Sequence, residues 1–261
     1  MPDRRSTAAV WAAVSGMTAG EAWLRRDEPQ PPEMVERVQS ALAQLERGVP
    51  FPYATGRVGF RALDLTIDAR ALIPRPETEG LVDLVLRHAQ GGLAADIGTG
   101  SGCIALALAT EGSFDRVIAV ERSPQAAALA RENVALVHPR TPVEIREGDL
   151  LAPLAGARYR AIVANPPYLT EAEYSGLEDS VKAFEPREAL VSGPDGLDAT
   201  RALLAGASAL LESEGVLALE IDERRGDAVR ALAHAFGWTC IETHHDIFGR
   251  PRYVLAFPQE G

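Results

Sequence analysis

Hydrophobic and polar positions after Gly92 follow a repeating pattern of short apolar runs and segments with apolar residues at helical spacing. The runs predict strands at 93–97, 116–121, 143–146, 161–164, 216–221, 238–243 and 252–257. The spaced segments predict helices at 103–111, 124–137, 197–211 and 223–236. Strands that alternate with helices favour a doubly wound, parallel α/β sheet.

The end of the chain departs from this alternation. The strands expected at 238–243 and 252–257 are joined by a short loop with a turn at 248–251. A parallel pair needs a longer crossover, so these two strands must pair antiparallel. We therefore expect an α/β fold whose seven-stranded, mostly parallel sheet ends in an antiparallel C-terminal hairpin.

The first 90 residues carry a different pattern. Apolar residues at helical spacing predict helices at 11–14, 19–26 and 33–47. Alternating residues at 58–67, with a break near Arg61, predict a small β-hairpin. The chain thus divides into a short helical module at 1–50, a β-hairpin linker at 51–75 and the α/β domain at 76–261.

The net charge of the chain bears on whether it binds nucleic acid. The 261 residues include 37 acidic and 26 basic ones, a formal net charge of −11. The first 90 residues hold 12 acidic and 11 basic ones, so most of the excess negative charge lies beyond residue 90. Because general nucleic-acid binders usually carry a basic footprint, we expect no direct nucleic-acid binding.

Two further classes lack support in the sequence. No uncharged apolar run reaches the ~20 residues that span a bilayer, and no signal peptide is recognised, so we expect a cytoplasmic protein without membrane association. Cys103 and Cys240 are too few for a disulfide framework, and we expect both to be buried apolar residues. His244 and His245 lack a second cluster at ligand spacing, so no metal site is expected.

A glycine-dense turn follows the first strand of the expected sheet. It reads Asp96-Ile97-Gly98-Thr99-Gly100-Ser101-Gly102. Its third glycine comes one residue too early for the dinucleotide fingerprint, and no Gly-Lys-Ser/Thr ending marks a phosphate loop. The pattern D-x-G-x-G-x-G instead resembles the first motif of S-adenosylmethionine-dependent methyltransferases. The cofactor would then lie against Asp96, Gly98, Thr99, Gly100, Ser101 and Gly102.

Acidic residues follow the next two strands. Glu121 ends the second strand 23 positions after Gly98. A carboxylate at this place can accept hydrogen bonds from both ribose hydroxyls. Asp149 and Leu150 follow the third strand. In methyltransferases this place lies beside adenine, so Asp149 would accept a hydrogen bond from the adenine amino group and Leu150 would pack on the ring.

The most informative stretch is Asn165-Pro166-Pro167-Tyr168, directly after an apolar strand. The prolines fix the backbone and lack N–H donors, while Asn165 adds an acceptor and Tyr168 an aromatic face. Two acceptors can hold a planar –NH₂ group beside a methyl donor and favour the pyramidal nitrogen that develops during transfer. We therefore predict that Asn165 and Tyr168 are catalytic, and that carbonyls of this segment help to hold the acceptor.

This motif leaves the acceptor open. It suits the amino group of adenine or cytosine in nucleic acid, and equally the side-chain amide of glutamine. A non-catalytic binding module that retains the fold is a third possibility, although the intact motifs argue against it. The lack of an arginine or lysine cluster interleaved with aromatic residues disfavours nucleic acid.

Other segments resemble one family, the release factor glutamine methyltransferases. They are Gly48-Val49-Pro50, Tyr53-Ala54-Thr55-Gly56, Leu72-Ile73-Pro74-Arg75-Pro76-Glu77-Thr78-Glu79, Phe184-Glu185-Pro186-Arg187-Glu188-Ala189-Leu190 and Asp195-Gly196-Leu197. The resemblance implies a Rossmann-like methyltransferase domain and transfer of a methyl group from S-adenosylmethionine to a glutamine in the Gly-Gly-Gln motif of a peptide chain release factor. Ribosomal-protein glutamine methyltransferases resemble the chain less closely.

The resemblance also assigns roles to individual parts. It implies that the loop from Gly98 to Gly102 and Glu121 hold the cofactor. It also implies that Asn165 contacts both cofactor and glutamine, and that Pro166, Pro167 and Tyr168 bind the glutamine. The family often has an aromatic residue where this chain has Leu150. The helical module at 1–50 would dock the release factor, and we expect the protein to act as a monomer.

Overall fold

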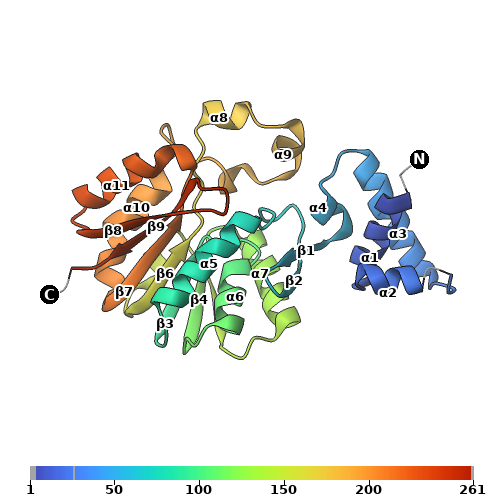
Figure 1. Ribbon diagram of the computed structural model, residues 1–261, viewed down its shortest axis with the longest axis horizontal. Coiled ribbons are helices and arrows are strands. Elements are labelled where there is room, and N and C mark those ends of the chain that lie inside the picture. Colours follow the sequence, from blue (N-terminus) through green and yellow to red (C-terminus); the bar gives the residue numbers. More distant parts are fainter. Residues whose placement is uncertain (1–3, 26, 260–261) are drawn as a thin grey trace.

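The computed structural model describes residues 4–25 and 27–259, and its main body is a central sheet covered by helices on both faces (Figure 1). The sheet has seven strands in the order β5-β4-β3-β6-β7-β9-β8. Their bounds are β3 Leu93–Ile97, β4 Arg116–Glu121, β5 Val143–Glu147, β6 Tyr159–Ala164, β7 Leu211–Glu220, β8 Cys240–His245 and β9 Pro251–Phe257. The pairs that include β9 are antiparallel and the others parallel, which confirms the expected sheet.

Helices cover the two faces of this sheet separately. One face carries α5 (Pro76–His88), α6 (Cys103–Glu111) and α7 (Pro124–Val137), and the other carries α10 (Asp198–Gly206) and α11 (Gly226–Ala235) (Figure 1). Every residue of α6 from Cys103 to Ala109 is buried, as expected for a helix that is apolar on all sides. The core therefore forms two apolar layers, one on each side of the strands.

The predicted helices agree with the structure to different degrees. The bounds of α6 and α7 are those expected from the sequence. The other two expected helices are shorter, because one ends and the other begins in a 3₁₀ turn, at Ala207–Leu210 and Glu223–Arg225. The sequence pattern did not predict α5, although Pro76 at its start and Arg87 in its last turn are typical helix-end residues.

The starts of several strands differ from the predictions, and β6 begins at Tyr159 rather than at 161. Strand β7 begins at Leu211 rather than at 216, with a register irregularity opposite Tyr159. Strand β8 begins at Cys240 rather than at 238, because the Trp238 indole is buried and donates a hydrogen bond to Leu204 O. Cys103 is buried as expected, but Cys240 is exposed, because β8 is the edge strand of the sheet.

The N-terminal helices stand to one side of the main body (Figure 1). They are α1 (Arg4–Ser15), α2 (Ala19–Leu24) and α3 (Pro32–Glu46), followed by the short α4 (Phe51–Thr55). Residues of α1 and α3 form a small core of their own. The helix expected at 19–26 ends at Leu24, and Arg26 lies outside the described residues.

A hairpin and two short helices complete the structure. Strands β1 (Arg57–Phe60) and β2 (Leu63–Thr66) form the expected hairpin. Helices α8 (Glu171–Ser175) and α9 (Asp179–Phe184) rise above the carboxyl end of β6 (Figure 1). Across the described parts of the chain, no helix has both the length and the apolar character needed to cross a membrane.

Candidate active site

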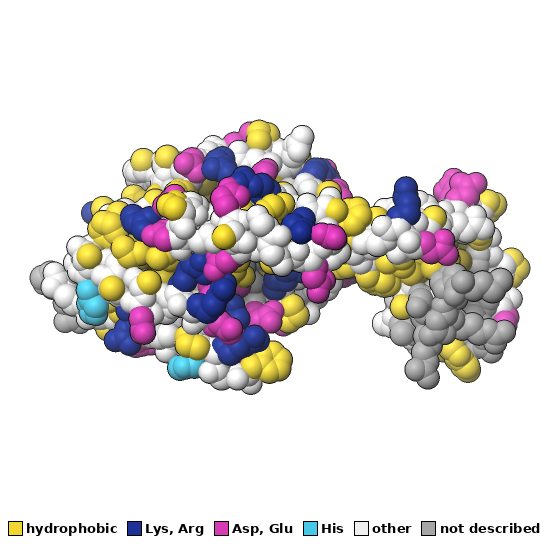
Figure 2. Space-filling model, turned by 90° about the horizontal axis from the view of Figure 1, so that it is seen from above, with side chains coloured by type: hydrophobic (Ala, Val, Ile, Leu, Met, Phe, Trp, Pro, Cys, Tyr) yellow, Lys and Arg dark blue, Asp and Glu magenta, His cyan; other side chains and the backbone are white. Residues whose placement is uncertain are grey.

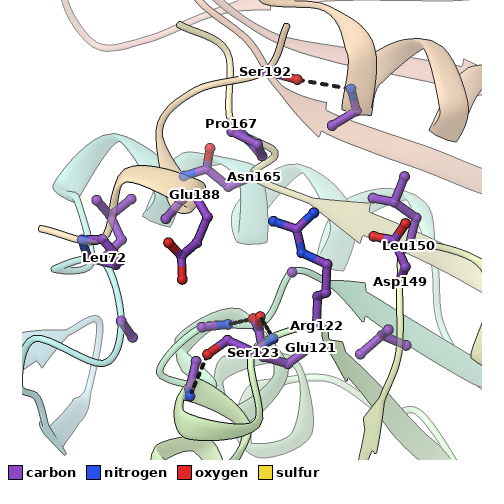
Figure 3. Close-up of a pocket in the computed structure, with 18 of the residues that line it drawn as sticks. Leu72, Glu121, Arg122, Ser123, Asp149, Leu150, Asn165, Pro167, Glu188 and Ser192 are labelled. Carbon is purple, nitrogen blue, oxygen red and sulfur yellow. Dashed lines mark hydrogen bonds between the residues drawn. The ribbon is translucent and has the colours of Figure 1, made fainter. Parts of the chain in front are cut away.

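A cavity of about 600 Å³ opens at the carboxyl ends of β3, β4, β5 and β6 (Figure 3). The chain moves outward from β3 through β4 to β5 and then returns to the other side of β3 as β6. Such a reversal of strand order is where open α/β sheets bind ligands. A volume of this size is typical of sites for small molecules and cofactors.

The glycine turn forms the floor of this cavity at Gly98 and Gly100. Both residues line the cavity with left-handed φ angles of 72° and 55°. A Cβ at Gly98 would meet no atom within 4 Å, so the absence of a side chain leaves space beside the backbone. Glycine therefore lets the main chain take this turn and lets a ligand approach it closely.

The remaining loop residues shape the turn from below. Asp96 is fully buried, and its Oδ2 accepts hydrogen bonds from Thr99 Oγ1 at 2.6 Å and Ala105 N at 3.0 Å. Burial raises the pKa of Asp96 to about 7. Thr99 and Ser101 are also buried, and Gly102 packs against α7, so none of these four belongs to the cavity wall.

Glu121 lies where the glycine turn meets the cavity. Its Oε2 accepts a hydrogen bond from Gly100 N at 2.9 Å, and its Oε1 accepts one from Ser123 N at 2.9 Å (Figure 3). Each carboxylate oxygen can accept more than one hydrogen bond. Glu121 therefore holds the loop and retains acceptor capacity for a pair of ligand hydroxyls.

Asp149 and Leu150 form another part of the wall (Figure 3). Asp149 is exposed, and Leu150 is half-buried against the apolar layer beneath α10. Leu150 has a left-handed φ of 45°, which is uncommon for a residue with a branched side chain. This pair can offer an acceptor and an apolar surface to a planar ring.

The Asn-Pro-Pro-Tyr segment contributes to the cavity through two of its four residues. Asn165 and Pro167 line the cavity, Pro166 is buried, and Tyr168 is half-buried outside the wall. Burial raises the pKa of the Tyr168 hydroxyl to about 12, with a further contribution from the Glu220 carboxylate. The structure therefore brings Asn165 into the same cavity as Gly98 and Glu121.

Thr78 and Glu220 stand behind Asn165, and the sequence reasoning did not assign them to the site. Asn165 Nδ2 lies 3.1 Å from Thr78 Oγ1, which in turn lies 2.7 Å from Glu220 Oε2. Both Thr78 and Glu220 are 2% exposed. Thr78 lies inside one of the family-like segments, and Glu220 ends a buried strand, so both carried a sequence signal.

Further cavity residues were not assigned to the site from the sequence, although four of them lie in the family-like segments 72–79 and 184–190. They are Arg70, Ala71, Leu72, Arg122, Ser123, Pro186, Glu188, Ala189, Val191, Ser192, Gly193, Asp198 and Ala199. Arg122 reaches into the cavity in Figure 3, where it stands between Asn165 and Leu150. The segment around Glu188 is held from below, because Arg75 Nη2 contacts both carboxylate oxygens of the buried Glu185 at 2.7 and 2.6 Å.

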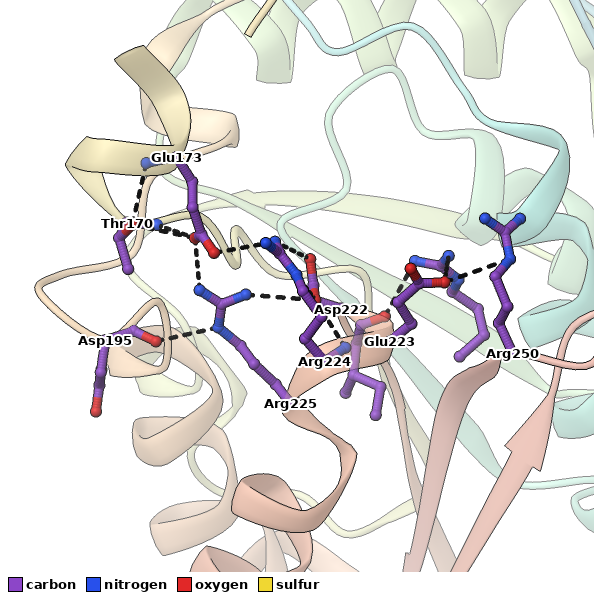
Figure 4. A network of polar contacts seen from close by, with 10 residues as sticks. Thr170, Glu173, Asp195, Asp222, Glu223, Arg224, Arg225 and Arg250 are labelled. Carbon is purple, nitrogen blue, oxygen red and sulfur yellow. Dashed lines mark hydrogen bonds and ion pairs between the residues drawn. The ribbon is translucent and has the colours of Figure 1, made fainter. Parts of the chain in front are cut away.

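A network of charged side chains fastens α8 and the 195–197 loop to the end of β7 (Figure 4). Arg225 pairs with Glu173 Oε2 at 2.5 Å and donates to Asp195 O at 3.1 Å. Arg225 also lies 3.4 Å from Asp222, and both residues are buried. The loop that follows Asn-Pro-Pro-Tyr is thereby tied to the sheet.

Comparison with known proteins agrees with this arrangement. The family model of the methyltransferase small domain matches residues 78–182. Among solved structures, a methyltransferase from Pyrococcus furiosus has a TM-score of 0.57 at 19% identity and covers 86% of this chain and 97% of its own. The 16S rRNA N2 G1207 methyltransferase of Thermus thermophilus, solved with AdoMet and guanosine, has a TM-score of 0.55 at 18% identity, covering 78% of this chain and 50% of its own. These likenesses establish the methyltransferase fold.

Proteins with similar sequences identify the family within this fold. The release factor glutamine methyltransferase of Moorella thermoacetica is 41% identical over 254 residues, covering 96% of this chain and 89% of its own. That of Xylella fastidiosa strain Temecula1 is 42% identical over 248 residues, covering 93% and 90%. At this identity, over nearly the full length of both partners, the chain belongs to the release factor glutamine methyltransferase family.

Proposed function

We propose that this protein transfers a methyl group from S-adenosylmethionine to the side-chain amide nitrogen of a glutamine in a peptide chain release factor. One observation carries the proposal: Asn165, from Asn-Pro-Pro-Tyr, lines the same cavity as Glu121 and the glycine turn. A site for a nucleoside-bearing methyl donor and a site for a planar –NH₂ group would thus be adjacent. Family membership favours the glutamine of the Gly-Gly-Gln motif as the acceptor.

The donor would lie across the carboxyl ends of β3, β4 and β5. Its amino-acid tail would approach Gly98 and Gly100, and its ribose hydroxyls would donate hydrogen bonds to Glu121. Its adenine would lie against Asp149 and Leu150. The four loop residues outside the wall, Asp96, Thr99, Ser101 and Gly102, would act by fixing the turn. The open space beside Gly98 and the free acceptor capacity of Glu121 both fit such a ligand.

The acceptor would be held by the Asn-Pro-Pro-Tyr segment. When bound, S-adenosylmethionine supplies an electrophilic methyl group on a sulfonium. Asn165 Oδ1 and a carbonyl of the proline segment would each accept one N–H of the glutamine amide, while Pro167 and Tyr168 position its planar group. The amide lone pair then forms the N–C bond as the C–S bond breaks, and one amide proton leaves to water. Positioning supplies most of the rate enhancement.

The rest of the molecule would serve the protein substrate. The helical module at 1–50 would dock the release factor, the 51–75 segment would link it to the methyltransferase domain at 76–261, and the enzyme would act as a cytoplasmic monomer. On the face seen in Figure 2, basic and acidic side chains are interspersed rather than gathered in a basic stripe. This supports a protein acceptor over nucleic acid.

The decisive experiment is incubation with labelled S-adenosylmethionine and a purified release factor, followed by mass mapping of the labelled residue. We expect one methyl group on the glutamine of Gly-Gly-Gln. Parallel reactions contain a ribosomal-protein mixture and nucleic acid. Label that appears in either of these and not on the release factor would overturn the proposal.

A further inference from the structure

A chain of two hydrogen bonds leads away from the cavity into the core. It runs from Asn165 Nδ2 to Thr78 Oγ1 at 3.1 Å and from Thr78 Oγ1 to Glu220 Oε2 at 2.7 Å. Thr78 and Glu220 are almost completely shielded from solvent. The three residues come from the end of β6, the first turn of α5 and the end of β7, so three separate elements meet at this point.

The number of protons available determines the direction of both hydrogen bonds. An ionised carboxylate only accepts, and a threonine hydroxyl carries one hydrogen. When Glu220 is ionised, Thr78 must donate to it, so Thr78 Oγ1 can only accept from Asn165. The –NH₂ group of Asn165 is then held toward α5, and its carbonyl oxygen Oδ1 is turned away from Thr78.

We propose that Glu220, acting through Thr78, is a positioning residue that fixes the amide of Asn165 with its carbonyl oxygen presented to the acceptor. This inference rests on the proposed function, because it assigns a purpose to the orientation of a residue thought to bind glutamine. With the opposite orientation, Asn165 would present N–H donors to an –NH₂ group, and the acceptor would not be held.

The surrounding structure holds Thr78 in place. The hydroxyl of Tyr253 donates to Glu77 O at 2.6 Å, which ties the first turn of α5 to β9. Tyr253 reaches this carbonyl because the neighbouring residue of α5 is Gly80, where an added Cβ would lie 2.4 Å from the Tyr253 hydroxyl. Thr78 therefore cannot move away from Glu220 without displacing the whole helix end.

The charge of Glu220 depends on pH in the neutral range. Burial raises the pKa of Glu220 to about 7, and the hydrogen bond from Thr78 opposes this rise. The other titratable or charged groups that act on it or feel its charge are Arg75, Glu77, Cys103, Tyr168, Arg252 and Tyr253. A protonated Glu220 can donate to Thr78, which frees the Thr78 hydroxyl to donate to Asn165 Oδ1 and invert the amide.

The test compares Thr78→Val, which cannot bond to either partner, with Thr78→Ser, which restores both bonds. We expect Thr78→Val to lower kcat for the release factor at least tenfold, with the Kd of S-adenosylmethionine changed less than twofold. Thr78→Ser should return kcat to within about threefold of the unmodified enzyme. Thr110→Val is the matched control, because the Thr110 hydroxyl donates to the carbonyls of Leu106 and Ala107 in its own helix.

A second measurement does not depend on methyl transfer. In the protein selectively labelled with ¹⁵N-asparagine, one side-chain N–H of Asn165 should be protected from exchange, and Thr78→Val should abolish that protection. The pH profile of kcat should rise through about pH 7 and become flat in Glu220→Gln. Unchanged kcat in Thr78→Val, or identical pH profiles for the two enzymes, would overturn the inference. If the unmodified enzyme transfers no methyl group, the proposed function fails, whereas the exchange measurement still decides the orientation of Asn165.

Discussion

At the scale of single residues, two carboxylates near the glycine turn make different contacts. Glu121 lines the cavity and accepts one backbone N–H on each oxygen, which leaves further acceptor capacity. Asp96 holds the turn through its Oδ2, which accepts from Thr99 and from the amide of Ala105, while its buried Oδ1 has no hydrogen-bond partner among the described residues. Two acidic residues near one loop therefore have different tasks, which spacing along the sequence does not reveal.

Replacing Glu121 tests the first of these tasks. Glu121→Gln changes one acceptor into a donor, so the side chain can no longer satisfy Gly100 N, Ser123 N and two ligand hydroxyls together. We expect the Kd of S-adenosylmethionine to rise about 10- to 100-fold, since hydrogen bonds to charged groups are worth ~1.5–3 kcal/mol. Isothermal titration calorimetry measures this change. Glu147→Gln, an exposed carboxylate at the end of neighbouring β5, should leave the affinity unchanged.

The contribution of Asp96 to folding stability should depend on pH. The pKa of Asp96 is raised in the folded state to about 7, above its ordinary value of 3.8. The folded state then binds more protons than the unfolded state between these values, so this residue's contribution to stability falls as pH rises from about 4 to 7. Asp96→Asn should gain about 1–2 kcal/mol relative to the unmodified protein between pH 5.5 and 7.5, measured by urea unfolding. Parallel stability curves for the two proteins would contradict the assignment.

At the scale of elements, predictability follows local signals. The bounds of α6 and α7 could be predicted because both lie between clear strands and carry continuous apolar faces. The site residues on strand ends, Gly98, Glu121 and Asn165, could be predicted for the same reason. Helices α8 and α9 could not, because neither has a buried residue. Ion pairs of Glu173 hold α8, and the partly buried Phe184 packs α9 against a small apolar cluster. Thr78 and Glu220 were missed because they meet only through the tertiary fold.

Substitutions in the network around Arg225 test how much it stabilises the protein and holds α8. Removing Arg225 takes away one of the two arginines that pair with Glu173 and Asp222, while Arg224 still contacts both. Hydrogen bonds to charged groups are worth ~1.5–3 kcal/mol, so Arg225→Met should cost about 2 kcal/mol of unfolding free energy. Proteolysis between 165 and 197 should also become faster, because α8 loses one of its two arginine contacts through Glu173. The control Arg187→Met removes an exposed pair with Glu171 and should cost under about 1 kcal/mol. Equal losses in both variants would contradict a special role for the buried network.

At the scale of the whole molecule, the N-terminal helices and the cavity are separate. Residues of α1 and α3 pack on one another, while the cavity is built from the rest of the chain. The end of α2 leaves Leu24 71% exposed. If this module docks the release factor, its surface contributes to recognition of the intact protein and not to the chemistry at the glutamine.

This separation predicts a split between two substrates. Leu24→Asp should raise KM for the intact release factor several-fold and leave KM for a short Gly-Gly-Gln peptide unchanged, as measured by steady-state kinetics. Phe236→Asp is the control, because Phe236 is also an exposed apolar residue and lies at the end of α11, on the main body. An equal effect on both substrates would place Leu24 outside any docking surface.

The bond between Tyr253 and Glu77 also bears on how the protein matures. It joins residues 176 positions apart, and Tyr253 lies on the last strand of the sheet. During synthesis, Glu77 and the rest of α5 emerge long before Tyr253, so the first turn of α5 lacks this contact until the last strand has been made. The support of Thr78 therefore depends on the far end of the polypeptide, and a chain that ends before β9 should lack it.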